Sequence, residues 1–91
     1  MPVLVPSKDP SSILDYGVDW VDWLGSDTIS TSSWGVTPAG LTAVSSNRVG
    51  AVTTVWLSGG TVGTTYSATN TIVTAAGRTD QRTLLVSIQD R

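Results

Sequence analysis

The chain alternates apolar and polar residues in short runs that are separated by glycine, proline, serine and asparagine. In the first such run, every second position is apolar: Leu14, Tyr16, Val18 and Trp20. A period of two places these side chains on one face of an extended strand, because successive residues of a strand point to opposite sides of a sheet. Helical spacing of apolar residues is hard to find. The pattern therefore predicts an all-β fold.

Turn residues recur at short intervals along the whole chain. They divide most of it into runs that favour strands, namely 14–20, 28–36, 41–46, 51–58, 65–74 and 82–89. With the terminal segment these make about seven short strands, a number typical of an immunoglobulin-like (Ig-like) β-sandwich. Gly63 and Tyr66, where a long strand begins, resemble the tyrosine corner of that fold, in which a tyrosine hydroxyl bonds to the preceding backbone.

The first twelve residues differ from the rest, since they hold three of the four prolines: Pro2, Pro6 and Pro10. Proline lacks an amide hydrogen and biases its neighbour towards extended backbone. We therefore expect an extended N-terminal arm over residues 1–12 and a single β-sandwich domain over residues 13–91. The arm is too short and too rich in proline for a signal peptide. Its apolar residues are predicted to anchor it on a neighbouring protein: Val3, Leu4 and Val5.

The composition argues against catalysis and metal binding. The chain has no histidine, no cysteine and no glutamate, so the usual general base near neutral pH and the commonest zinc ligands are missing. Ser7 and Lys8 are unsuited to a Ser-Lys dyad, because neighbours on an extended chain point to opposite sides. The aspartates lack the spacing of a calcium loop. We predict no catalytic residue, no metal site and no cofactor.

Charged residues are few and unevenly distributed. They make up 13% of the chain, with a net charge of −2. Residues 1–45 hold five aspartates and one lysine, whereas residues 46–91 hold four arginines and two aspartates. Opposite-signed faces suit head-to-tail packing in a symmetric homo-oligomer, although such charges also balance within one domain. There is no basic stripe for nucleic acid and no membrane-spanning run of about 18 apolar residues, so neither partner is expected.

Four tryptophans and no phenylalanine raise the question of what fills the core. We expect at least two of the tryptophans to be core residues, with Trp56 foremost because it lies in an apolar strand. Trp23 is out of phase with the strand before it and is the predicted interface tryptophan. The alternative is a carbohydrate-binding module, in which exposed, coplanar tryptophans stack on sugar rings.

Several segments in a fixed order complete the pattern. The first half contributes Asp15-Tyr16, Asp19-Trp20, Trp23-Leu24, Asp27-Thr28-Ile29 and Trp34. The second half contributes the stretches 55–60 and 74–80, together with Gly63-Thr64, Tyr66 and Asn70. Taken together, residues 9–90 resemble a family of small Ig-like virion proteins of tailed bacteriophages that are labelled fibre–tail adaptors. The resemblance implies a structural role and no catalytic residues.

These observations predict a non-enzymatic structural component of a tailed-phage virion, assembled in the host cytoplasm. It is expected to dock on other virion proteins, either on the major capsid protein as a decoration (cement) protein or on tail and fibre proteins as an adaptor. The predicted interface residues are Val3, Leu4, Val5 and Trp23. A carbohydrate-binding module and a small hydrolase with paired aspartates are the alternatives from other functional classes.

Overall fold

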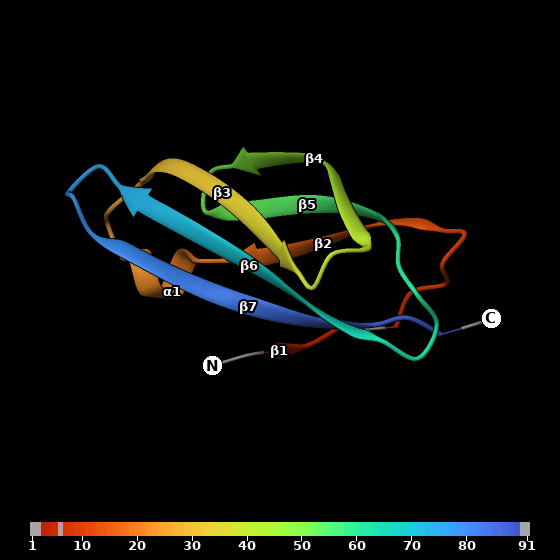
Figure 1. Ribbon diagram of the computed structural model, residues 1–91. Coiled ribbons are helices and arrows are strands. Elements are labelled where there is room, and N and C mark those ends of the chain that lie inside the picture. Colours follow the sequence, from red (N-terminus) through yellow and green to blue (C-terminus); the bar gives the residue numbers. More distant parts are fainter. Residues whose placement is uncertain (1–2, 6, 90–91) are drawn as a thin grey trace.

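The structure, a computed structural model, describes residues 3–5 and 7–89 and folds them into two packed β-sheets (Figure 1). Its elements are β1 (Val3–Leu4), β2 (Ile13–Asp19), α1 (Val21–Leu24), β3 (Ile29–Thr37), β4 (Leu41–Val49), β5 (Val52–Gly59), β6 (Thr65–Thr74) and β7 (Thr79–Ser87). The short helix α1 contains Trp23, the residue that the sequence pattern put out of phase with the strand before it. No helix in the described part of the chain is long and apolar enough to cross a membrane.

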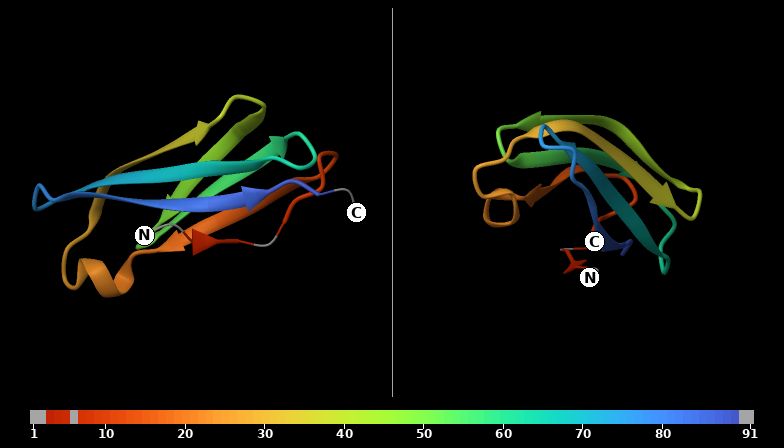
Figure 2. Two further views of the ribbon diagram at one scale, coloured as in Figure 1. Left: turned by 60° about the horizontal axis from the view of Figure 1, so that its bottom comes forward. Right: turned by 90° about the vertical axis from the view of Figure 1, so that its left-hand side faces the viewer.

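The strands form a three-stranded sheet in the order β2-β5-β4 and a four-stranded sheet in the order β1-β7-β6-β3. All pairs are antiparallel except that of β1 with β7. Figure 2 shows the two sheets as the layers of a sandwich, with the chain crossing between them after β1, β2, β3 and β5. This arrangement confirms the predicted Ig-like β-sandwich.

The core lies between the sheets and is built by the predicted alternation. In β6 every second side chain from Tyr66 to Thr74 is buried. In β7 and just after it, Leu84, Val86 and Ile88 form the matching row. Each large apolar side chain that moves from water into this core contributes roughly 1.5–3 kcal/mol.

Tyr66 makes the predicted tyrosine corner. Its hydroxyl oxygen accepts a hydrogen bond from the backbone N–H of Thr61 at 3.0 Å. The hydroxyl also lies against Gly40, where an added Cβ would come within 2.9 Å of it. The bond therefore fixes the loop between β5 and β6, where the chain passes from one sheet to the other, and the close approach requires glycine at position 40.

A buried hydrogen-bond network joins the two sheets around Asn70 of β6. Its Oδ1 accepts from Trp20 Nε1 at 3.0 Å and from Thr53 Oγ1 of β5 at 2.6 Å. Its Nδ2 donates to Ser32 Oγ at 2.9 Å and to the carbonyl of Ser33 at 3.0 Å, both in β3. All four hydrogen-bonding positions of the amide are thus used, which is what a buried polar side chain requires.

The described residues at the start of the N-terminal segment lie along their own domain. Val3 and Leu4 pair in parallel with β7, and the N–H of Val5 donates to the carbonyl of Leu85 at 3.1 Å. Lys8 is fully buried, and its ammonium donates to the carbonyls of Asp9 and Gly59, each at 2.8 Å. Burial lowers the pKa of Lys8, with the Asp9 charge acting in the opposite direction. Val3 and Leu4 therefore form an edge strand, and the buried Lys8 attaches the segment to the domain.

Candidate docking surfaces

The structure places the predicted interface residues in two different settings. Val3 and Leu4 form β1, and Val5 is half-buried against the core. Trp23 is also half-buried, and its ring packs edge-on against Trp20 with 5.5 Å between centroids and 70° between planes. The arm and Trp23 thus each contribute partly to the domain itself. Their interface role stays a prediction.

Beside Trp23, Arg78 and Asp27 form an ion pair with 3.1 Å between Nε and Oδ2. The Arg78 guanidinium also lies 4.4 Å from the centre of the Trp23 ring and donates to the carbonyl of Leu24 at 3.0 Å. A hydrogen bond from Thr74 is the main reason why the pKa of Asp27 is lowered, with further help from Arg78 and two backbone N–H groups. This ion pair joins an acidic residue of the first half of the sequence to a basic residue of the second half. Part of the uneven charge distribution is therefore neutralised within one domain.

Trp56 lies on the outer face of the three-stranded sheet, and so its expected core position is wrong. It is 39% exposed, whereas its neighbours Val55 and Leu57 are fully buried. Because Thr53, Val55 and Leu57 point inward, the pleat of β5 turns Trp56 outward. In the ladder Trp56 stands between Asp15 of β2 and Ser45 of β4.

Other large apolar side chains share this outer face. Ile13 is 59% exposed and is placed opposite Ser58, so it is the diagonal neighbour of Trp56. Val49 is 73% exposed and stands directly opposite Val52, which is also exposed. We call Ile13, Val49, Val52 and Trp56 the Trp56 face. Exposed apolar side chains gathered on one face are typical of surfaces that bind other proteins.

The four tryptophans do not form a stacking platform. Trp20 is fully buried, Trp23 and Trp34 are half-buried, and Trp56 alone of the four is exposed. A sugar-binding surface of the kind set out above needs several exposed, coplanar rings. The geometry therefore favours protein contact at the Trp56 face over carbohydrate stacking.

β4 is the most exposed strand of the described chain. Leu41 is buried, but every residue from Thr42 to Val49 is exposed. Among the residues that the structure describes, β4 pairs only with β5, so its other edge is free. Ser46 and Arg48 pair with the inward-facing Val55 and Thr53, yet they too are exposed. The inner side of β4 is therefore left uncovered where β3 diverges from it.

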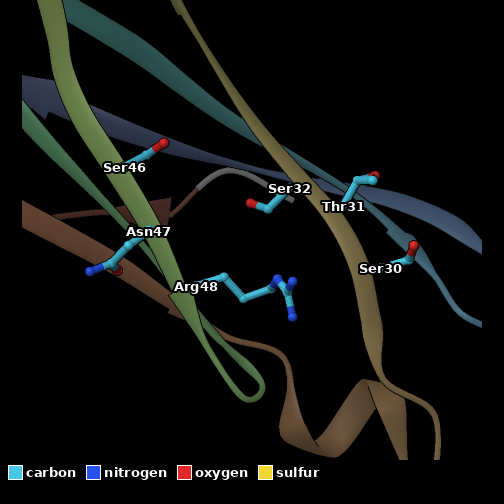
Figure 3. Close-up of a pocket in the computed structure, with 6 residues that line it drawn as sticks. All are labelled: Ser30, Thr31, Ser32, Ser46, Asn47 and Arg48. Carbon is cyan, nitrogen blue, oxygen red and sulfur yellow. The ribbon is translucent and has the colours of Figure 1, made fainter.

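The uncovered space is a polar cleft of about 280 Å³ between β3 and β4, lined by Ser30, Thr31, Ser32, Ser46, Asn47 and Arg48. We call it the β3–β4 cleft. Figure 3 shows Ser32 and Arg48 extending from the two strands into the gap, whereas Asn47 points to the other side of β4. Within residues 3–5 and 7–89, Arg48 has no ion pair, hydrogen bond or aromatic partner. Ser32 is fixed by its bond from Asn70.

Residues 8–87 match the sequence model of the podophage GP4 fiber-tail adaptor protein gp77. The chain belongs to this family. The match confirms the resemblance that the sequence motifs indicated and makes the protein a structural component of the phage particle. No curated protein matches the chain in sequence.

Sequence reasoning missed both surfaces of the adaptor that the fold exposes most clearly. The run 55–57 is apolar at every position, so alternation does not tell which of its side chains face out. Arg48 falls within the turn expected between the runs 41–46 and 51–58, and only the divergence of β3 from β4 gives it a cleft to occupy. The Trp56 face thus had an ambiguous signal in the sequence, and the β3–β4 cleft had none.

Proposed function

We propose that this adaptor holds a fibre on the phage tail by docking on both through separate surfaces of one rigid sandwich. The observation that carries the proposal is the family match, which spans nearly the whole sandwich. The role is mechanical and non-enzymatic. The two sheets and the network around Asn70 supply a body that does not deform, and surface side chains supply the contacts.

The Trp56 face draws on all three strands of its sheet and suits a body-to-body contact with the tail. Tryptophans are enriched among the residues that dominate binding energy, and truncating such a residue typically costs about 2 kcal/mol or more. Trp56 lies on the central strand of its sheet, where a partner surface can surround it and exclude water. Asp15 and Ser45 beside it supply polar groups that fix the orientation of the partner.

The N-terminal segment and Trp23 are further interface candidates. β1 is the outer strand of the four-stranded sheet and pairs on one side only, so a neighbouring strand can add to it. Val3, Leu4, Val5 and Trp23 are proposed to contact a second copy of the adaptor, as a symmetric homo-oligomer on the tail requires. A capsid position would use the same surfaces, and the family match favours the tail.

Deleting the adaptor gene tests the role in the particle. Particles purified without the adaptor are expected to keep heads and tails but lose fibres, and adaptor supplied from a plasmid should restore them. Fibre and adaptor copies per particle are counted by quantitative mass spectrometry, and a density map locates the adaptor. Normal fibre content without the adaptor, or density for it on the capsid shell alone, contradicts the proposal.

Trp56→Thr tests the assigned surface, with Val73→Thr as the matched control. Val73 is also exposed, but it lies on β6 in the opposite sheet. We expect Trp56→Thr to reduce adaptor copies per particle severalfold while the protein still unfolds in one transition above the assembly temperature, and Val73→Thr to leave incorporation unchanged. Equal incorporation of the two variants excludes the Trp56 face as the tail contact.

A further inference from the structure

We infer that the β3–β4 cleft receives an extended segment of the fibre protein, which adds as a strand to the free edge of β4 and places a carboxylate on Arg48. This inference rests on the proposed adaptor function and names the chemistry of one of its two contacts. It is carried by the shape of the cleft, its polarity, its charge and the backbone that borders it.

The outer edge of β4 has backbone groups that a further strand can pair with. After the irregularity between Ala43 and Ser45, the pairing of β4 with β5 is regular from Ser45 to Val49. These five residues span about 17 Å of extended chain, and half of their N–H and C=O groups point away from β5. An incoming strand of similar length pairs with those groups, as in other complexes formed by strand addition.

The lining of the cleft selects a polar segment. All six residues that line it carry hydroxyl, amide or guanidinium groups. An amphipathic helix is excluded because the cleft offers no apolar wall. A nucleic acid strand is disfavoured because the cleft holds one cation, whereas backbone recognition uses several.

The charge of Arg48 selects an acidic residue on that segment. In the described part of the chain, Arg78 is paired with Asp27, the guanidinium of Arg82 stacks on the ring of Trp20, and Lys8 is buried. Arg48 by contrast projects into the cleft and meets no partner there (Figure 3). A guanidinium binds a carboxylate through two parallel hydrogen bonds, which adds direction to the charge attraction.

The size of the cleft points to the fibre as the source of the segment. A fibre is elongated and is held at one end, so a short stretch of extended chain is enough to attach it. A volume of about 280 Å³ accommodates side chains from such a stretch. The Trp56 face, with its four exposed apolar side chains, is left for the tail.

Binding of purified fibre protein to the purified adaptor tests this assignment. Arg48→Gln removes one positive charge, and Val62→Asp, in the exposed loop between β5 and β6, changes the net charge by the same amount away from the cleft. We expect Arg48→Gln to weaken fibre binding about tenfold or more, Arg48→Lys to lose less, and Val62→Asp to bind like wild type. The unfolding temperature should not change, because Arg48 is exposed and unpaired. Unchanged fibre binding by Arg48→Gln overturns the inference.

Hydrogen exchange on the same samples identifies the occupant. Amides within Ser45–Val49 that exchange rapidly in the free adaptor should be protected at least tenfold when fibre protein is added. Protection that appears with rising adaptor concentration alone assigns the cleft to a second copy and overturns the inference. If the deletion experiment shows that fibres need the adaptor but these amides stay unprotected, the cleft assignment fails while the adaptor function stands. If fibres do not need the adaptor at all, the function itself fails.

Discussion

Replacing Asn70 with leucine tests whether the buried network holds the two sheets together. The change removes the Oδ1 that accepts from Trp20 Nε1 and Thr53 Oγ1. All three residues are 0% exposed, so water does not replace the lost acceptor. A buried donor without a partner costs about 1–3 kcal/mol. Because the Thr53 hydroxyl can rotate, we expect a total loss of about 3–4 kcal/mol.

This loss is large for a domain of 91 residues, whose free energy of unfolding is expected to be roughly 5–14 kcal/mol. The midpoint of thermal unfolding should fall by about 15–25 °C. Urea unfolding followed by tryptophan fluorescence measures the free energy directly. Val73→Ala serves as the control in the same strand, and since Val73 is exposed, it should cost less than about 1 kcal/mol.

A second substitution separates the lost hydrogen bonds from altered packing. Thr53→Val alone should destabilise by about 1 kcal/mol. In the Asn70→Leu background the same change removes a hydroxyl that has lost its acceptor, and it should cost nothing or restore stability. The expected coupling between the two positions is about 1–2 kcal/mol. Additive effects, or an Asn70→Leu variant that loses less than about 1 kcal/mol, refute the reasoning.

Three further predictions concern stability. The pKa of Asp27 is lowered in the fold, so its carboxylate stabilises the folded state above its ordinary pKa of about 3.8. That stabilisation is lost as the pH falls through the lowered pKa. In acid titrations, Asp27→Asn should therefore make the free energy of unfolding depend less on pH below about 4. Tyr66→Phe removes the hydroxyl that accepts from Thr61 and should cost about 1–2 kcal/mol in urea unfolding. An unchanged midpoint would show that the corner is dispensable. Gly60→Ala places a Cβ 2.6 Å from the Ile88 side chain at a φ of +101°, and a loss of about 2–4 kcal/mol is expected by calorimetry; a neutral result would mean that the loop and Ile88 shift without cost.

The sequence predicted the strands well because alternation and turn chemistry are local. The runs 65–74 and 51–58 match β6 and β5 closely, and the tyrosine corner was visible from Gly63 and Tyr66. The run 41–46 was extended by the structure to Val49, since pairing with β5 continues through the expected turn. Asn70 was visible only as part of the family motif, because its role as a bridge depends on residues 17 to 50 positions away.

By itself, the sequence determined the fold class, the lack of histidine and cysteine chemistry, and the motifs that identify the family. Those properties follow from residue types and from spacings within one strand or turn. Only the tertiary structure decided that Trp56 faces out, that the N-terminal segment lies on β7, and that Arg48 projects into a cleft. The physical reason is that alternation assigns side chains to two faces of a strand, whereas the packing of distant strands decides which face is covered and which edge is left free to bind.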